Sequence, residues 1–441
     1  MSEFLRRARQ LAFAATLALA GAALAADEDD EPPMAPGGGG EATATKDWHA
    51  PLNALGFTGS ARAGLWSSNR RLDDDNGIVV PSAWLKLDRR MGPVGVFAEG
   101  YLAREDLFGD RRSASRLREA YVEGRHGNWD FRVGKQIIAW GRTDRLNPTD
   151  VLTPRDFTLL SPEIDEDRFG AVAAKAVYTF TPSTSLIGVW LPDFRPNVLG
   201  LPMRPGVRYT EDVPDSLRTW ALKLDRSGGA VDWSVSYFDG FDLSADLSLA
   251  TATGTSSTIA LQHHRLRMIG GDAATTIGSN RYAVEVAYAR TEDPDGRNLF
   301  VRNPFLYGVV GIEHDFGDTL DLIVQAYVRQ VCAHQDPENA PANVRALAIQ
   351  QAVASNQVDR HQTGLTARIG RKWLNETLEG EIAGSVLVTR TGYSLRPRVL
   401  YAVSDSLKVI GGFEWYRGSD RTTFGLLEKN RTLFGEVRYF F

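Results

Sequence analysis

The sequence predicts an all-β protein, namely a transmembrane antiparallel up-and-down β-barrel of about 18 strands, with 16 as the alternative count. Three observations support this fold class. An export signal stands at the N-terminal end, segments with two-residue hydrophobic periodicity fill most of the chain, and the last residues are Tyr439, Phe440 and Phe441. Exported amphipathic strands with an aromatic final strand fit a barrel with lipid outside and water inside.

Residues 1–25 are predicted to be a secretory signal peptide. Arg6, Arg7 and Arg9 precede a short apolar run over residues 11–23, and residues 23–25 read Ala-Leu-Ala, a small-x-small cleavage pattern. The run is shorter than the roughly 20 residues of a membrane-spanning helix, and no later run reaches that length. We therefore expect an exported mature chain without a transmembrane helix.

Charge and cysteine content narrow the class of protein. The full sequence has a net charge of −5, and its first 25 residues carry three Arg and one Glu, so the mature chain has a charge of −7. This acidic balance argues against a nucleic-acid partner. Cys332 is the single cysteine, so no internal disulfide can form, and a closed hydrogen-bonded barrel would supply the stability instead.

Residues 26–55 are predicted to be a flexible periplasmic tail. The segment has an acidic patch over residues 27–31, prolines at 32, 33 and 36, and glycines over residues 37–40. This composition cannot bury a core. A partner-binding peptide is the alternative reading of the same segment.

Residues 56–441 are predicted to form the barrel. In residues 321–329, Leu322, Val324, Ala326 and Val328 alternate with polar or larger residues, as in a strand with one wet face. Similar segments of about ten residues, the length of a tilted membrane-crossing strand, recur along the chain. They begin near residues 57, 80, 94, 116, 129, 169, 185, 217, 230, 265, 281, 304, 319, 360, 377, 394, 407 and 431. The count is least certain between residues 241 and 278.

The connections between these segments are predicted to alternate strictly between short turns and long loops. Short turns such as residues 91–93 and 126–128 would face the periplasm, and long loops such as 139–168 and 332–359 would face outward. An even strand count places both termini in the periplasm. Aromatic residues near segment ends would form an interfacial girdle.

The final strand carries a predicted assembly signal. Leu433, Gly435, Val437, Tyr439 and Phe441 share one face of the strand. A terminal Phe preceded by alternating apolar and aromatic residues resembles the C-terminal signal of outer-membrane barrel proteins. That resemblance implies that Val437, Tyr439 and Phe441 are read by the barrel-assembly machinery.

The wet faces of the strands are predicted to line the lumen. The charged residues predicted to form the lumen wall are Arg62, Glu99, Glu119, Glu123, Asp130, Arg132, Arg368, Arg396, Arg398 and Arg438. The acidic members come from strands three to five, and most of the arginines come from strands near the closure seam. An acidic wall facing a basic wall would create a transverse field. The alternative is that these charges pair locally across neighbouring strands.

Residues 139–168 are predicted to form an ordered loop that folds into the lumen as a constriction. The pattern Leu-x-Pro-x-Asp occurs at residues 146–150 and again at 152–156, which fits two successive turns. Ordered loops of this length are uncommon and usually functional. The predicted constriction residues are Arg142, Asp144, Arg145, Asn147, Asp150, Arg155 and Asp156. The alternative is an outward cap that rigidifies the rim.

The same region carries a family resemblance. Residues 133–136 (Val-Gly-Lys-Gln), 139–142 (Ala-Trp-Gly-Arg) and 147–150 (Asn-Pro-Thr-Asp) resemble a motif of proteobacterial outer-membrane channel families, including alginate-export-type and porin-like barrels. The resemblance covers about forty residues, besides the barrel pattern and the terminal Phe. It implies an outer-membrane channel. Acidic residues are nearly as numerous as basic ones in the expected lumen, whereas alginate exporters resemble this chain in strand number but have an Arg-rich lumen.

Together these observations predict an outer-membrane channel for passive diffusion of small polar or charged solutes. An exporter of a polysaccharide or lipid working with periplasmic partners, and a closed structural or adhesive barrel, are the alternatives. No catalytic residues, metal ligands or cofactor are expected, because no nucleophile, metal-ligand or nucleotide motif is present. The expected partners are outer-membrane lipid, lipopolysaccharide and the assembly machinery. The sequence is compatible with a homo-oligomer and does not determine the oligomeric state.

Overall fold

The computed structural model describes residues 50–68, 70, 77–105, 112–201, 205–214, 218–317 and 319–441. The predicted signal peptide, and the predicted tail up to residue 49, lie outside the described residues. The short helix α2 (Ala50–Ala54) occupies the last part of the segment that was expected to be a tail.

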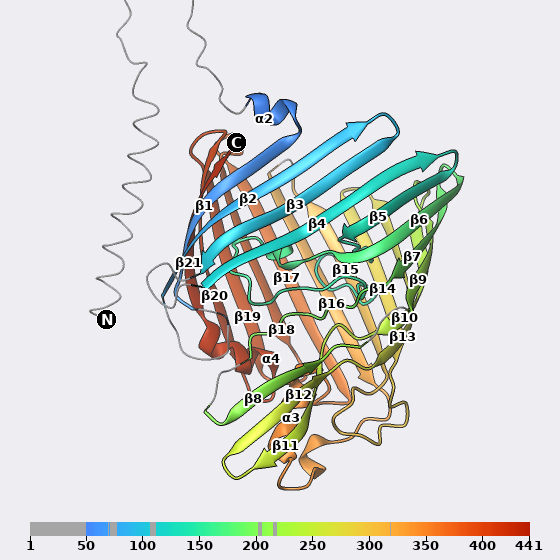
Figure 1. The fold of residues 1–441 in the computed structure, drawn as a ribbon, viewed down its shortest axis with the longest axis vertical. Coiled ribbons are helices and arrows are strands. Elements are labelled where there is room, and N and C mark those ends of the chain that lie inside the picture. The colour runs from blue at the N-terminus through green and yellow to red at the C-terminus, as the bar shows by residue number, and fades with distance from the viewer. Residues whose placement is uncertain are drawn as a thin grey trace, which may run out of the picture. The chain divides into compact units, whose positions relative to one another are not determined.

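Among the described residues, 18 strands form one closed antiparallel sheet, as predicted (Figure 1). Each strand starts within four residues of its expected position, and the largest difference is at Arg112. The barrel strands are β1 (Phe57–Trp66), β2 (Ile78–Met91), β3 (Val94–Glu105), β4 (Arg112–His126), β5 (Trp129–Gln136), β6 (Ala171–Thr181), β7 (Thr184–Leu191), β9 (Thr219–Arg226), β10 (Asp232–Phe241), β13 (Arg265–Ile277), β14 (Asn280–Arg290), β15 (Phe305–Asp315), β16 (Leu320–Val331), β17 (His361–Trp373), β18 (Leu378–Leu387), β19 (Gly392–Ala402), β20 (Leu407–Gly418) and β21 (Thr432–Phe440).

The two-residue periodicity separates an apolar outer face from an inner face. In β14, Val284 and Val286 on the outer face are each 45% exposed, whereas Glu285 between them is fully buried on the inner face. Exposed Val and Tyr side chains without a soluble core to cover them fit contact with lipid. A closed barrel with an apolar outer face is the transmembrane architecture of the bacterial outer membrane, and the chain is a protein of that membrane.

The barrel closes between its first and last strands. β1 pairs with β21, with Ala63 opposite Val437 and Ala61 opposite Tyr439. Beyond the end of β21, Phe441 exchanges two backbone hydrogen bonds with Gly59, of 2.8 and 3.0 Å. The predicted assembly-signal residues therefore lie at the closure seam, and their recognition by an assembly machinery stays a prediction.

The expected strict alternation of short and long connections is wrong at one place. The connection between β18 and β19 spans only residues 388–391, although it lies on the same side of the barrel as the long loops. Tight antiparallel pairing of Leu387 with Gly392 needs no more chain than this. The alternation holds for the long connections 137–170, 192–218, 242–264, 291–304, 332–360 and 419–431.

The long loops carry a small second sheet, which explains the uncertain count between residues 241 and 278. Strand β12 (Ser256–Gln262) pairs antiparallel with β11 (Asp246–Thr253) and parallel with β8 (Val207–Asp212). In Figure 1 this sheet lies near α3, at the barrel end away from the C-terminus. The loop helices are η1 (Ile164–Asp167), η2 (Pro337–Asn339), α3 (Arg345–Ala354), α4 (Thr423–Leu426) and η3 (Leu427–Asn430). Within the described ranges, no helix has the length and apolar character to cross a bilayer.

Candidate channel lumen

The connection between β5 and β6, residues 137–170, runs inside the barrel and not above its rim (Figure 1). Its residues bond to inward side chains of strands that lie on opposite sides of the sheet, such as Arg62 in β1 and Glu285 in β14. We call this connection the lumen segment. Its contacts show which parts of the wall hold it in place.

The first anchor is the carboxylate of Glu285, which is fully buried. It accepts hydrogen bonds from the Thr149 backbone N–H and hydroxyl, both at 2.8 Å, from the Thr143 hydroxyl at 2.9 Å and from the Arg142 N–H at 3.2 Å. Gly141 has φ +106°, and a Cβ there would lie 2.5 Å from Glu285 Oε2. The turn can therefore wrap around the carboxylate only with glycine at this position.

Arg142 extends from the same turn to two further strands. Its guanidinium lies 2.9 Å from Asp225 in β9 and also contacts Asp272 in β13. Its carbonyl oxygen accepts a hydrogen bond of 2.9 Å from Arg281 in β14. The two wall carboxylates neutralise the guanidinium, so Arg142 is a bonded anchor of the lumen segment.

The next two predicted residues point to the opposite wall. Arg145 lies 3.2 Å from Glu381 in β18, and Asp144 lies 3.6 Å from Arg368 in β17. Arg368 and Glu381 also pair with one another at 3.4 Å. These four side chains form an alternating charge cluster that joins the lumen segment to β17 and β18.

The remaining predicted residues hold the lumen segment in its own fold. Asn147 donates to the Thr143 carbonyl at 2.9 Å and accepts from the Asp150 N–H at 3.1 Å. Asp150 lies 2.6 Å from Arg168 and 3.6 Å from Arg155. Local turn hydrogen bonds and internal ion pairs are what the repeated Leu-x-Pro-x-Asp pattern suggested.

Arg155 and Asp156 continue this internal bonding and add one wall contact. Arg155 pairs with Asp167 at 2.9 Å, and Asp156 accepts from the Thr158 N–H at 2.9 Å. Asp156 also pairs with Arg116 of β4 at 2.7 Å. Thus every predicted constriction residue is bonded either within the lumen segment or to the barrel wall.

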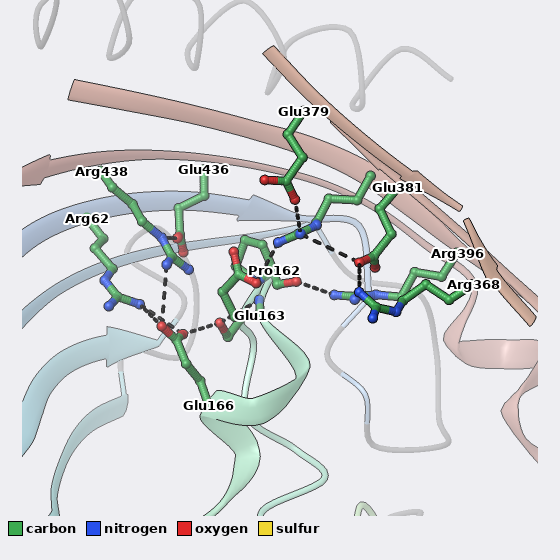
Figure 2. A network of polar contacts seen from close by, with 12 residues as sticks. Arg62, Pro162, Glu163, Glu166, Arg368, Glu379, Glu381, Arg396, Glu436 and Arg438 are labelled. Carbon is green, nitrogen blue, oxygen red and sulfur yellow. Dashed lines mark hydrogen bonds and ion pairs between the residues drawn. The ribbon is translucent and has the colours of Figure 1, made fainter. Parts of the chain in front are cut away.

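Sequence reasoning missed Glu166, which anchors the second half of the lumen segment. Arg62 and Arg438 lie directly opposite one another across the closure seam, and Glu166 lies between them at 2.9 and 3.3 Å (Figure 2). Glu436 contacts Arg438 from its own strand. Two like charges facing each other on paired strands destabilise the sheet unless an anion bridges them, and Glu166 provides that bridge.

Two more arginines of the predicted wall hold the turn before Glu166. Arg396 donates to the Pro162 carbonyl at 2.5 Å (Figure 2). Arg398 pairs with Glu163 at 2.5 Å. Arg398 also pairs with Glu379 of the neighbouring strand at 2.9 Å. The arginine-rich wall is therefore paired with carboxylates of the lumen segment and of adjacent strands. A surplus of loop carboxylates in residues 163–167 was the available sequence signal.

The predicted acidic wall is bonded in the same local manner. Its four members take hydrogen-bond or ion-pair partners from adjacent strands and from the start of the lumen segment. These contacts are Glu99 with Arg118 at 2.7 Å, Glu119 with the Ile137 N–H at 2.7 Å, Glu123 with Arg132 at 2.7 Å and Asp130 with Arg125 at 2.6 Å. This arrangement corresponds to local pairing, the second of the two alternatives drawn from the sequence.

The wet strand faces were expected to line the whole lumen, but part of the inner face is apolar. Ile138, Trp140 and Leu152 of the lumen segment pack in a buried cluster with inward residues such as Phe238 and Met268. These apolar contacts hold one side of the lumen segment against the wall formed by β6 to β15.

Arg329 differs from the other arginines of the inner face. Its guanidinium carbon lies 3.8 Å from the ring centroid of Phe305 and 5.8 Å from that of Tyr307. Its Nε and Nη2 atoms are buried and have no hydrogen-bond partner among the described residues. A guanidinium held on aromatic faces without a carboxylate can receive an anionic group.

Comparisons with known proteins agree with this fold. Residues 98–243 match the model of a protein family of unknown function, DUF1302. Acinetobacter baumannii OccAB1 shares 11% identity, covers 87% of this chain and 95% of its own, and has a TM-score of 0.52. Pseudomonas aeruginosa OccK2 (OpdF) in complex with glucuronate shares 10% identity over 87% and 95%, also with a TM-score of 0.52. Pseudomonas aeruginosa OpdK with vanillate shares 9% identity over 87% and 98%, with a TM-score of 0.50. No curated protein matches the sequence.

Proposed function

We propose that the protein is a porin-like channel for passive diffusion of small polar or charged solutes, with the lumen segment as its constriction. The observation that carries this proposal is the anchoring of residues 137–170 to opposite walls of an 18-stranded barrel. A barrel of this strand number is wide enough for an aqueous channel, so a segment fixed across it sets the effective width.

The chemistry of the interior favours charged or polar solutes over apolar ones. Ion pairs line the wall beside the lumen segment, and Arg329 offers a guanidinium without an ion-pair partner in the described part of the chain. Solutes with hydrogen-bonding groups can exchange water for these side chains, whereas apolar solutes cannot. The similar channels OccK2 and OpdK were solved with glucuronate and vanillate, which are both small carboxylates.

Single-channel recording in a planar bilayer tests the proposal. Deletion of residues 147–155 removes the middle of the lumen segment and should raise the conductance severalfold, because the narrowest part of the path widens. Deletion of the equally long segment 293–301, from the connection between β14 and β15, is the matched control and should leave the conductance unchanged.

The other outcomes discriminate between the alternatives. If the intact barrel and the deletion variant conduct equally, the lumen segment is not the constriction. If a correctly folded intact barrel does not conduct but the deletion variant does, the protein is gated or closed at rest, as an exporter or a structural barrel would be. The reversal potential in a salt gradient gives the sign of the preferred ion.

A further inference from the structure

A row of four side chains, three of them charged, crosses the outer face of the barrel near the loop ends of four strands. Strand pairing places Trp220 of β9 opposite Asp239 of β10, Asp239 opposite Arg267 of β13, and Arg267 opposite Arg290 of β14. These residues alternate with inward residues of the same strands, such as Met268, so the row faces outward. Charged residues on this face need a polar partner, because the face meets the membrane.

The row carries more positive than negative charge. Arg265 and Arg267 share the single carboxylate of Asp239, with Arg267 Nε at 3.0 Å. Arg290 is exposed and has no ion-pair partner among the described residues. Glu292, at the loop end of the row, accepts the backbone N–H of Arg265 at 3.1 Å.

The direct opposition of Arg267 and Arg290 is the unexplained feature of this row. Like charges at directly opposed positions destabilise paired strands. The corresponding arginine pair on the inner face, Arg62 and Arg438, is bridged by Glu166. No such carboxylate lies between Arg267 and Arg290 in the part of the chain that the structure describes. An external anion that binds both guanidinium groups would fill the same role.

The neighbouring outward residues show where this anion would come from. The next row toward the barrel middle consists of Tyr288, Ile269, Tyr237 and Leu222, all apolar or aromatic. Ile269 is 55% exposed, which suits contact with acyl chains. The charged row thus lies at the boundary between the apolar belt and the loop side of the barrel, which faces the cell exterior.

We propose that Arg267 and Arg290, assisted by Arg265, bind a phosphate group of lipid A, the membrane anchor of lipopolysaccharide. Lipopolysaccharide forms the outer leaflet of this membrane, and its phosphates lie at the level where acyl chains end. Guanidinium groups bind phosphate oxygens in a bidentate manner, and the exposed Ile269 and Tyr288 offer a surface to the acyl chains. This site is independent of whether the lumen conducts.

Native mass spectrometry of the detergent-solubilised barrel with bisphosphorylated lipid A tests the proposal. The double variant Arg267→Gln/Arg290→Gln should raise the apparent Kd by about tenfold or more, since both charged phosphate contacts are lost. Arg104→Gln is the matched control, because Arg104 faces outward at the loop end of β3 opposite Ser113, without a second arginine. This control should bind lipid A like the unaltered protein.

Competing ligands identify the source of the phosphate. Dephosphorylated lipid A and inorganic phosphate should bind at least about tenfold more weakly than lipid A, because each lacks one half of the interaction. Equal lipid A binding by the double variant and the unaltered barrel overturns the site. Equal binding of phosphatidylglycerol and lipid A overturns the assignment to lipopolysaccharide. Heat-dependent migration on gels verifies that each variant is folded before it is measured.

Discussion

Glu285 illustrates how a single wall residue shapes the lumen segment. Its donors are backbone N–H groups, the Thr143 and Thr149 hydroxyls and the Asn147 amide, which lies at 3.4 Å. Neutral donors that converge on one anion form a binding turn of the kind that holds phosphate in other proteins. Here the anion belongs to the barrel itself, so the turn is fixed to one strand.

Replacement of Glu285 by Gln should loosen this turn. The amide nitrogen of Gln is itself a donor, so it cannot accept the hydrogen bonds that the carboxylate oxygen accepts from the turn. Each buried donor left unpaired lowers the stability by about 1–3 kcal/mol. We expect a lower midpoint of thermal unfolding in detergent, and larger and noisier single-channel currents. Glu123→Gln is the control, because Glu123 bonds Arg90 and Arg132 of the wall and no residue of the lumen segment. Unchanged currents in Glu285→Gln would contradict the anchoring role.

At the scale of elements, one carboxylate joins the small loop sheet to its neighbours. Asp246, at the start of β11, accepts from His264 Nδ1 at 2.8 Å and from the Arg302 N–H at 3.1 Å, and it also contacts Gln351 of α3. Gln351 in turn accepts the Leu247 N–H at 2.6 Å. The loop sheet, α3 and the connection after β14 therefore depend on one buried acidic group.

This network should make the loops sensitive to pH. The hydrogen bond to Asp246 raises the pKa of His264 above its ordinary 6.5 against the opposing effect of burial, and Glu292 and Asp242 add to the rise. A raised folded pKa means that the stabilisation is complete below about 6.5 and is lost as pH rises through the raised pKa. Limited proteolysis of the loops should thus be slower near pH 6 than near pH 9.

Two single histidine variants, one at His264 and one at His334, test this prediction. His264→Gln should remove most of the difference in proteolysis rate between the two pH values. His334→Gln should retain the difference, because His334 bonds the Gln357 and Val358 carbonyls and no carboxylate. Proteolysis rates in the unaltered protein that do not change with pH would refute the proposed dependence.

Sequence periodicity predicted the positions of the strands better than the side-chain contacts between distant parts of the chain. The strands were predictable because each one alternates, as Val284, Glu285 and Val286 do, and alternation is a local property. The inward course of the lumen segment was predicted from its turn pattern. The anchoring role of Glu166 was not predicted, because its partners Arg62 and Arg438 are 104 and 272 positions away. Such contacts depend on closure of the whole barrel, which no local pattern encodes.

For the molecule as a whole, the closure seam determines whether a barrel forms. Gly59 lies at this seam, and a Cβ there would be 2.6 Å from the Trp84 carbonyl oxygen and 2.7 Å from the Phe441 ring. Gly411, in the nearby strand β20, would place a Cβ no closer than 3.9 Å to any neighbour. The two glycines therefore differ in the space that an added methyl group would find.

Alanine substitution at these two positions tests the importance of the seam. Gly59→Ala should reduce the fraction of protein that migrates as a folded barrel in unheated detergent gels, because the backbone of β2 and the Phe441 ring would have to move apart. Gly411→Ala should migrate like the unaltered protein. Equal folded fractions for both variants would show that the seam tolerates the added group.

The bridge that Glu166 makes between Arg62 and Arg438 also links the position of the lumen segment to the closure of the barrel. These two guanidinium groups face one another only after the first strand has paired with the last. Until that event, the second half of the lumen segment lacks its partners at the seam. An unclosed barrel would therefore hold the lumen segment at its first half alone, through Glu285, Asp225 and Asp272.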